Sequence, residues 1–333
     1  MSDDAKGPKQ DAVTRREFLA RTTVTLAAAG ALPGLGTAAA TVAGGGLPHR
    51  VLGRTGVSVS VLAFGCGSRF LSYEDEEAAL AVLEKAFSLG VTYYDTAMDY
   101  GDGKSESRLG RFLGRHRADV FVATKIPTRA RTRDLALKEV EASLKRLQTD
   151  HVDLLHVHSL GHAEDLERIQ ARDGVLQALY ELRDKKTARF IGMTSHTDGA
   201  VMATAIERHD LDCAQMAMNP ARAAAFEEKA LPAAAARKLG VLLMKSTAQE
   251  KLLGASGAQA GELLRYAWSL PVSAAVVGMP KPEMLEQNAA LARSFSPMTA
   301  AEMDALRQRL APKRAALERM FVAHCDGRPL AFA

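Results

Sequence analysis

Short apolar runs alternate with longer amphipathic segments from residue 57 onward, and this alternation limits the fold more than any other feature of the chain. Each apolar run has the length of a β-strand, and each following segment carries its apolar residues at helical spacing. Eight such strands are predicted, at residues 57–64, 91–96, 120–126, 152–158, 189–194, 212–218, 241–245 and 272–278. Eight strand–helix units within about 240 residues are typical of an α/β protein with a closed (β/α)8 TIM barrel.

An open, doubly wound sheet is the alternative that the same alternation allows. Such a sheet would carry a glycine-rich GxGxxG turn after its first strand, where the backbone approaches a dinucleotide closely. Here the first predicted strand ends at Gly65-Cys-Gly67 and continues with Ser68-Arg-Phe70, so the glycine-rich fingerprint is absent. The barrel is therefore the fold that we expect.

Two further elements flank the eight units. Residues 48–57 contain Gly53 and Gly56, which suggest a hairpin that closes the bottom of the barrel. One extra helix is predicted at residues 299–317, because Leu306, Leu310 and Leu317 fall on one helical face. We expect a single barrel domain over residues 46–333.

Residues 1–45 differ in character from the rest and are predicted to be an export signal with a linker. The stretch Thr14-Arg-Arg-Glu-Phe-Leu19 is a twin-arginine pattern, a mildly apolar run follows at residues 22–35, and Ala38-Ala-Ala40 offers a small-residue cleavage site. An amphipathic N-terminal helix is the alternative. Because glycines and Pro33 interrupt the apolar run, no stable membrane span is expected after processing. The signal predicts a periplasmic protein that meets the twin-arginine export machinery.

The composition of the chain limits the other kinds of partner and site that can be expected. Charged residues make up 25% of the chain, the formal net charge is +4, and no basic stripe with interleaved aromatic residues occurs. Nucleic-acid binding is therefore not expected. The three cysteines, Cys66, Cys213 and Cys325, are widely spaced and form no CxxC pair, so neither a disulfide framework nor a zinc site is predicted.

Four side chains with complementary acid–base chemistry lie at or near the ends of three consecutive predicted strands. Asp95, Lys125 and His158 come at the carboxyl ends of the second, third and fourth strands, and Tyr100 follows the second strand closely. Active sites of (β/α)8 barrels lie at that end of the strands, so we expect the four side chains to meet.

Together these residues could move a proton to or from an oxygen atom. A lysine ammonium near a tyrosine stabilises the phenolate and lowers the phenol pKa from about 10. Asp95 would hold the ammonium of Lys125, and a neutral His158 could donate to a substrate carbonyl. Tyr100 would then protonate an alkoxide as it forms, or deprotonate an alcohol in reverse. This chemistry needs a hydride partner, hence a nicotinamide cofactor and a small carbonyl or alcohol substrate.

The residues around this group resemble the signature motifs of the aldo-keto reductases. The resemblance rests on D-x-A-x-x-Y-G-x-x-x-S-E-x-x-L-G at residues 95–110, on Thr124-Lys125 and on Val152-Asp-Leu-Leu-His-Val-His158, within a match over residues 48–318. It implies a (β/α)8 barrel and NAD(P)(H)-dependent interconversion of carbonyls and alcohols. It would make Tyr100 the general acid and base, Lys125 its pKa depressor, Asp95 the partner of the lysine and His158 the carbonyl-orienting group.

The same resemblance implies a set of cofactor contacts. Thr194 and Ser195 stand at the fifth strand, where the family often has Ser-Asn to hold the nicotinamide carboxamide. Gln215 resembles the glutamine that also meets the carboxamide. Lys245 and Ser246 follow the seventh strand, where they could meet the pyrophosphate.

Residues 280–288 resemble the segment that binds the adenosine end of the cofactor. Asn288 keeps the adenine-contacting character, but Met284 stands where many members have an arginine for the 2′-phosphate. Lys281, Arg265 or Arg293 could supply the cation instead, because a phosphate needs only a well-placed positive charge. We therefore expect NADP(H) rather than NAD(H).

Two other interpretations remain open. His156 and His158 form an HxH pair on one strand face, which in some barrels binds a metal ion for hydrolysis. Those hydrolases resemble chains with the pair in the first strand, whereas here it lies in the fourth, so no metal is expected. The barrel could also bind a nucleotide without turnover, as a regulatory or sensing subunit. Because free NADPH is not expected in the periplasm, an exported enzyme would carry a cofactor bound before export.

Overall fold

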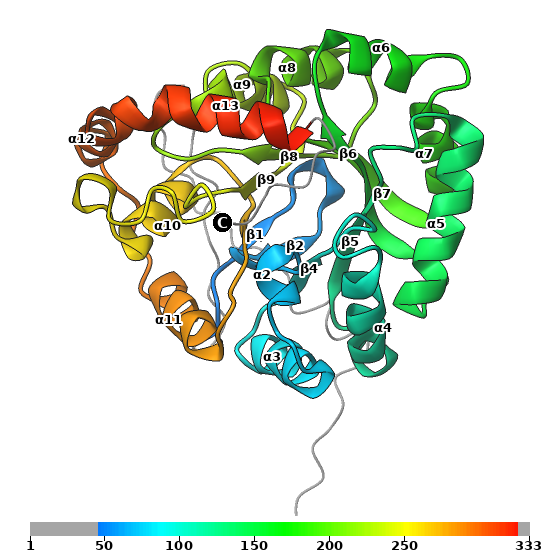
Figure 1. Ribbon diagram of the computed structural model, residues 1–333, viewed down its shortest axis with the longest axis horizontal. Helices are drawn as coiled ribbons and strands as arrows, with labels where there is room; N and C mark the ends of the chain where they lie inside the picture. The colour runs from blue at the N-terminus through cyan, green and yellow to red at the C-terminus, as the bar shows by residue number, and fades with distance from the viewer. Residues whose placement is uncertain (1–45, 326–333) are drawn as a thin grey trace, which may run out of the picture. The chain divides into compact units, whose positions relative to one another are not determined.

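The computed structural model describes residues 46–325. Residues 1–45, which contain the predicted twin-arginine pattern and cleavage site, lie outside the described residues, as do residues 326–333. Within the described range the chain forms the expected (β/α)8 barrel (Figure 1).

Eight parallel strands close into the barrel in the order β10-β3-β4-β5-β6-β7-β8-β9. Nearly all of their residues are buried, because one strand face points into the barrel and the other packs against helices. The strands are β3 (Leu62–Gly65), β4 (Tyr93–Asp95), β5 (Phe121–Ile126), β6 (Val152–Leu160), β7 (Ala188–Ser195), β8 (Cys213–Ala217), β9 (Gly240–Met244) and β10 (Ala274–Val277). All eight predicted strands are thereby confirmed.

Helices form an outer ring around the strands (Figure 1). Local signals set several of their starts: the Asp75 carboxylate accepts from the backbone N–H of Glu77 before α3, and Thr299 and Glu302 form a capping box at α12. The helices are α2 (Ser68–Leu71), α3 (Glu76–Ser88), α4 (Lys104–His116), α5 (Arg133–Leu147), α6 (Ala163–Gln170), α7 (Val175–Asp184), α8 (Gly199–Arg208), α9 (Ala230–Ala236), α10 (Ala260–Ser269), α11 (Pro282–Arg293), α12 (Ala300–Leu310) and α13 (Arg314–Cys325).

The predicted hairpin closes the N-terminal end of the barrel. β1 (His49–Val51) pairs antiparallel with β2 (Ser58–Ser60). Leu52, at the hairpin, is fully buried in one apolar cluster with interior barrel residues such as Tyr93 and Leu242. Gly53 has φ +50, and a Cβ there would lie 2.2 Å from the backbone nitrogen of Gly240. The hairpin therefore needs glycine at position 53, where it touches the barrel backbone.

Several boundaries differ from the sequence predictions. The first predicted strand, residues 57–64, is divided, because residues 58–60 belong to the hairpin and residues 62–65 to the barrel. The helix predicted at residues 299–317 is two helices, α12 and α13, separated by a 3₁₀ turn at Ala311–Lys313. Pro312 explains this break, since proline has no backbone N–H to continue an α-helix. The short helix α6 was not predicted.

Two further predictions concern a membrane span and the cysteine thiols. Over residues 46–325 no helix is both long and apolar enough to span a bilayer. Cys66 and Cys213 are buried free thiols, and burial raises the pKa of each well above its usual range. Neither thiol is therefore a reactive thiolate at neutral pH.

Candidate active site

The barrel brings the four predicted acid–base residues to one end. Asp95 ends β4, while Lys125 and His158 lie in the last part of β5 and β6, the next two strands around the barrel. In the strand register Lys125 lies opposite His156, two residues before His158. Tyr100 lies between β4 and α4, so it comes from a loop at the carboxyl ends of the strands.

Lys125 is the central residue of this group. Its Nζ atom donates to Oδ1 of Asp95 over 2.6 Å and to the backbone oxygen of Thr96 over 2.8 Å. Lys125 and Asp95 are only 1% and 2% exposed. Because an unpaired charge at such depth would be very costly, the two side chains depend on each other.

Tyr100 lies between the ammonium and the imidazole. Nζ of Lys125 is 4.9 Å from the centre of the Tyr100 ring. The His158 ring meets the Tyr100 ring edge-on, with centroids 5.7 Å apart and planes at 81°. The phenol is half-buried, in contrast to the fully buried lysine. Tyr100 is therefore the member of the group that a substrate could reach most directly.

Tyr100 and Lys125 both hold their protons at neutral pH. Burial raises the pKa of Tyr100, Lys125 lowers it and Asp95 raises it, and the net result lies above the usual 10.0. Burial lowers the pKa of Lys125, but Asp95 and Tyr100 together raise it by more, so the pKa lies above its usual 10.5. Lys125 thus acts on Tyr100 in the expected direction, but the desolvation of the phenolate outweighs it. Tyr100 is a neutral phenol that can donate a proton.

His158 is held by a carboxylate that was not among the predicted site residues. Its Nδ1 atom lies 3.1 Å from Oδ2 of Asp99. Burial lowers the pKa of His158, the hydrogen bond with Asp99 raises it and Lys125 lowers it, leaving the pKa below the usual 6.5. Burial raises the pKa of Asp99, but the hydrogen bond and the charge interaction with His158 lower it by more, so the pKa lies below the usual 3.8. At neutral pH the pair is a neutral imidazole and an ionised carboxylate.

Arg131 also holds the His158 segment and was missed at the sequence level. Its Nη2 atom donates to the backbone oxygens of His158 and Ser159 over 2.9 and 3.1 Å. The same guanidinium pairs with Asp165 over 2.8 Å. In the sequence Asp99 and Arg131 look like ordinary charged loop residues, and no spacing signal connects either with His158.

His156 lies deeper in the barrel than His158. Its ring is fully buried, and neither ring nitrogen has a hydrogen-bond partner among the described residues. Burial lowers the pKa of His156 well below 6.5, so the ring is neutral. Over residues 46–325 no group of three or more His, Cys, Asp or Glu side chains could hold a metal ion. Among these residues the HxH pair is therefore joined by no third His, Cys, Asp or Glu side chain that could complete such a group.

Gln215, in β8, has the feature that best fits a nicotinamide carboxamide. The side chain is 1% exposed, and its Oε1 acceptor has no hydrogen-bond partner within the described part of the chain. A buried acceptor without a partner costs free energy, and an amide N–H would satisfy it. The residues present therefore fit the amide end of such a cofactor.

Thr194 and Ser195, in β7, differ in how they are engaged. Thr194 lies opposite Gln215 in the strand register, and its Oγ1 accepts from the backbone N–H of Ser159 over 2.8 Å. Ser195 donates its hydroxyl proton to the backbone oxygen of Leu160 over 2.8 Å. Thr194 is therefore near Gln215, whose Oε1 has no partner among the described residues, whereas the Ser195 hydroxyl proton is already used within the protein.

The predicted pyrophosphate contacts follow β9 in a segment of unusual backbone. Ser246 is buried, and Lys245 has φ +62. Residues 248–250 also have positive φ values, which are costly for residues other than glycine. Glu250 pairs over 3.1 Å with Arg69, which follows β3. The segment after β9 is thus tied to α2, which follows β3, on the same end of the barrel as Tyr100.

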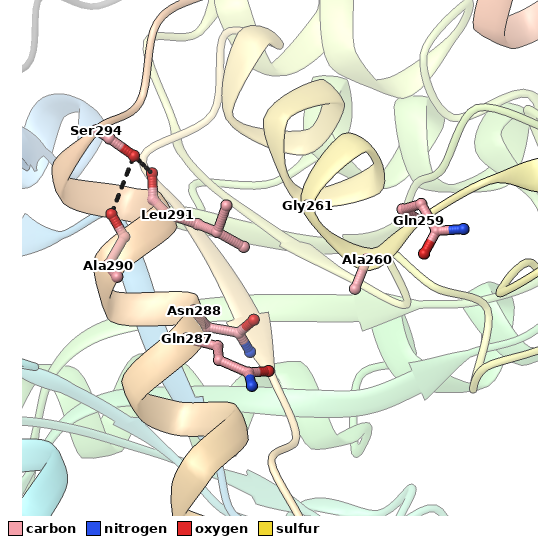
Figure 2. A pocket seen from close by; sticks show the side chains of 8 residues that line it. All are labelled: Gln259, Ala260, Gly261, Gln287, Asn288, Ala290, Leu291 and Ser294. Carbon is pink, nitrogen blue, oxygen red and sulfur yellow. Dashed lines mark hydrogen bonds between the residues drawn. The ribbon is translucent and has the colours of Figure 1, made fainter.

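The predicted adenosine contact Asn288 lies in α11 and is 7% exposed. It lines a pocket of about 490 Å³ between α10 and α11. Figure 2 shows residues from the start of α10 facing α11 across this pocket: Gln259, Ala260 and Gly261 on one side, and Gln287, Asn288 and Leu291 on the other. None of the four acid–base residues lines it.

The three candidate cations for a 2′-phosphate differ in availability. Arg265 pairs with Glu302 over 2.8 Å and donates to the backbone oxygen of Ser296. Arg293 donates to the backbone oxygen of Leu89. Lys281 directly precedes α11, is exposed, and makes no hydrogen bond or ion pair through its side chain with another described residue. Lys281 is therefore the candidate that can turn to a phosphate without breaking an existing contact.

The Aldo/keto reductase family profile matches residues 62–262, more than half of the chain, and the chain belongs to this family.

Several curated proteins are similar to parts of the chain. L-galactose dehydrogenase of Arabidopsis thaliana is 36% identical over 155 residues, which is 44% of this chain and 47% of that protein. A probable voltage-gated potassium channel subunit beta of the same plant is 33% identical over 34% of this chain and 37% of its own length. The NADP(+) aldo-keto reductase yakc of Schizosaccharomyces pombe is 32% identical over 44% and 45%. The chain thus spans about half or less of the length of these relatives.

Solved structures of aldo-keto reductases share the fold over most of their length. A putative aldo-keto reductase from Pseudomonas aeruginosa is 29% identical, with a TM-score of 0.61 over 74% of this chain and 94% of that one. The holo form of an aldo-keto reductase from Bacillus halodurans has a TM-score of 0.66 over 79% and 96%, at 22% identity. The second likeness concerns the fold alone.

Proposed function

We propose that the protein is an NAD(P)(H)-dependent oxidoreductase that interconverts an aldehyde or ketone and the corresponding alcohol. One observation carries the proposal: Lys125 bonds the buried carboxylate of Asp95 over 2.6 Å and lies 4.9 Å from the Tyr100 ring, beside His158. Proton transfer to an oxygen needs a donor, a cation to stabilise the phenolate that remains and a counter-charge for that cation. Tyr100, Lys125 and Asp95 supply these three groups in that order.

Each residue has a role in this reaction. The nicotinamide cofactor supplies or accepts the hydride when bound. Tyr100 donates its phenolic proton to the substrate oxygen during reduction and takes it back during oxidation. Lys125 stabilises the phenolate in between, and Asp95 keeps the ammonium charged and in place. His158 stands edge-on to Tyr100 and orients the substrate.

The cofactor contacts that we propose begin with Gln215 and Thr194 at the carboxamide. Support comes from the unpartnered Oε1 of Gln215 and from the register that sets Thr194 opposite it. Lys245 and Ser246 would meet the pyrophosphate, and Asn288 the adenine. Ser195 is the weakest member of the proposed set because it already donates to Leu160. Lys281 supports a preference for NADP(H) over NAD(H), and the name of the yakc relative agrees with that preference.

A nucleotide-binding subunit without turnover is the second candidate, because relatives include probable potassium channel beta subunits. The same tests distinguish it: such a protein would bind NADPH but would not turn over. Purified protein should be assayed with NADPH and with NADH over a panel of aldehydes, ketones and sugars, and with the matching alcohols and NADP⁺. Oxidation of NADPH by at least one carbonyl compound supports the enzyme. Binding of NADPH without consumption over the whole panel would favour the subunit.

For the N-terminal 45 residues we propose a twin-arginine signal, and with it a periplasmic protein that is exported folded with its cofactor already bound. The supporting observation is the Arg15-Arg16 pattern ahead of a nucleotide-binding type of barrel. Protein recovered from a periplasmic extract should release one equivalent of NADP(H) or NAD(H) on denaturation. Recovery from the cytoplasm alone, or from the periplasm with a competent but empty site, would contradict this part of the proposal.

A further inference from the structure

Asp95 and Lys125 each have a buried threonine next to them in the chain. Thr96 follows Asp95, and Thr124 precedes Lys125. Because side chains alternate between the two faces of a strand, Thr124 points outward to α4 where Lys125 points inward. A contact that Thr124 makes on the outer side of the barrel therefore acts on the same short stretch of backbone that carries the ammonium.

Glu106, in the first turn of α4, makes this contact. The Thr124 hydroxyl donates to Oε1 of Glu106 over 2.6 Å, and the Glu106 side chain has no exposed surface. Nε of Arg146, in α5, donates to the second carboxylate oxygen, Oε2, over 2.7 Å. Gly103 leaves room for the guanidinium, because a Cβ there would lie 2.6 Å from Nε of Arg146. A carboxylate at this depth is costly unless it is paired, so its two partners fix its position.

Ser105, the residue before Glu106, holds Thr96. The Ser105 hydroxyl donates to the backbone oxygen of Cys66 over 2.7 Å and lies 2.7 Å from the hydroxyl of Thr96. Since the single proton of Ser105 goes to Cys66, the Thr96 hydroxyl is the donor in the second bond. The backbone oxygen of Thr96 in turn accepts from Nζ of Lys125 over 2.8 Å. Ser105 thus bonds the residue that receives one hydrogen bond of the ammonium.

The first turn of α4 therefore bonds to the carboxyl ends of three consecutive strands. Cys66 follows β3, Thr96 follows β4 and Thr124 lies in β5. The backbone N–H of Ser105 also donates to the backbone oxygen of Tyr100 over 3.2 Å. One helical turn is thus bonded both to the loop that carries the phenol and to the strand ends that carry the ion pair.

We infer that Ser105 and Glu106 are positioning residues that set the distance between the Lys125 ammonium and the Tyr100 phenol. They act from the outer side of the barrel, through Thr96 and Thr124. This inference rests on the proposed function and extends it beyond the four acid–base residues. Contacts that served only to fasten α4 to the barrel would contribute to stability and leave the position of the ammonium unchanged.

The state of the ammonium can be measured without turnover. In full-length protein labelled with ¹⁵N-lysine, Lys125 should give a resolved ammonium signal at neutral pH, because its hydrogen bonds slow the exchange of its protons with water. Loss of the signal in Lys125→Arg assigns it. Thr124→Val keeps the side-chain shape but removes the hydroxyl, and should broaden the signal through faster exchange, whereas Thr124→Ser should keep it sharp. A signal that Thr124→Val leaves unchanged would overturn the inference.

Steady-state kinetics test the consequence for proton transfer. Thr124→Val should lower kcat for carbonyl reduction by up to about a hundredfold, the effect of misplacing a reacting group by about 1 Å, and should leave the Kd for NADPH unchanged. The solvent isotope effect on kcat should rise, because transfer of the Tyr100 proton becomes slower relative to the other steps. Thr124→Ser should restore both quantities. Failure of the serine variant to do so would argue against a role of the hydroxyl.

Two control variants separate a change of position from a loss of stability. Ser107→Ala removes a hydroxyl that donates to the backbone oxygen of Gly103 in the same turn, and kcat should stay normal. Leu113→Ala opens a cavity at the far end of α4 and should lower the urea midpoint at least as far as Thr124→Val does, with a normal isotope effect. If Leu113→Ala changed kcat and the isotope effect as Thr124→Val does, the contacts of α4 would be structural only.

Coupling between the two side chains tests whether Glu106 acts through Thr124. Glu106→Ala and the double variant Glu106→Ala with Thr124→Val should then have the same kcat within about twofold. Losses that multiply in the double variant would show two independent effects and would overturn the assignment of Glu106. Ser105→Ala, alone and combined with Thr96→Val, gives the same comparison for the second bond.

Failure of this inference and failure of the proposed function are distinguishable. If no carbonyl compound is reduced, the proposed function fails, while the lysine spectra still test the effect of Thr124 on the ammonium. If carbonyl compounds are reduced and Thr124→Val behaves like the unaltered protein, the function stands and the positioning role is wrong.

Discussion

Lys125 and Asp95 form a buried ion pair over 2.6 Å in which neither side chain is more than 2% exposed. The pair lies on adjacent strands, so the barrel backbone and not a loop sets its geometry. A charge that is fixed in this way needs no reorganisation when a neighbouring phenol loses its proton, which is the condition for strong electrostatic stabilisation.

Tyr100→Phe removes the phenolic proton and leaves the ring that packs between Lys125 and His158. We expect the variant to bind NADPH as before and to lose carbonyl reduction by about two to four orders of magnitude, the usual contribution of a positioned acid. Fluorescence titration with NADPH and steady-state assays would measure the two quantities. A variant that reduces carbonyls at the normal rate would remove Tyr100 from the role of proton donor.

The rate of carbonyl reduction should persist to strongly alkaline pH. Reduction needs the protonated phenol and is lost as pH rises through the Tyr100 pKa, and burial raises that pKa above 10.0. The alkaline limb of kcat/KM is therefore expected above pH 10.0. Assays of the NADPH-loaded enzyme in overlapping buffers would locate the limb, with unfolding monitored in parallel. A limb near neutral pH in a folded enzyme would mean that Lys125 outweighs burial after all.

Removal of one partner from the Lys125–Asp95 pair should destabilise the barrel. Lys125→Met leaves the Asp95 carboxylate buried without its cation, and the free energy of unfolding should fall by about 3–5 kcal/mol. The double variant Lys125→Met with Asp95→Asn carries no such charge and should regain part of this loss without regaining activity. Urea unfolding of the three proteins would give the comparison. Equal stability of the single and the double variant would argue against a mutually dependent pair.

Lys281→Ala should weaken NADPH binding and leave NADH binding nearly unchanged. One charge-assisted contact to a phosphate corresponds to about tenfold or more in Kd. Arg293→Ala is the matched control, because Arg293 is engaged with the backbone of Leu89. Titrations with both cofactors would separate the two residues. If Arg293→Ala raised the Kd for NADPH and Lys281→Ala did not, the assignment of the cation would be reversed.

Leu52→Ala should show how much the hairpin contributes to stability. The Leu52 side chain is fully buried among interior barrel residues, so its truncation should cost about 2–5 kcal/mol. Val51→Ala changes the preceding residue of the same hairpin, which is 53% exposed, and should cost little. Thermal or urea unfolding checks both variants. Similar losses for the two would mean that the interior contact of the hairpin has little energetic weight.

The barrel was predictable because its signal is repeated eight times and each repeat limits the next. The positions of Asp95, Lys125 and His158 were predictable for the same reason, since a residue at the carboxyl end of a barrel strand faces the site. The break at Pro312 had a local signal that a prediction based on leucine spacing alone overrode.

Two properties of the site could not be obtained from residue order. The direction in which the pKa of Tyr100 shifts depends on whether desolvation of the phenolate outweighs its attraction to the Lys125 ammonium, and that balance exists only in the folded barrel. The bond between Asp99 and His158 depends on two loops that meet in space, with Thr128 and Arg129 fixing the carboxylate. The spacing of residues along the sequence does not indicate that these segments meet.

The hairpin that fills the N-terminal end of the barrel also bears on the order of events. Among residues 46–325, Leu52 and its buried neighbours fill that end, so a cofactor and a substrate would both approach Tyr100 from the carboxyl ends of the strands. Two molecules that pass through one opening cannot exchange independently, because the one that lies deeper has to arrive first and depart last. The hairpin that closes one end of the barrel thus implies an ordered exchange, in which the more deeply bound molecule leaves only after the other one has left.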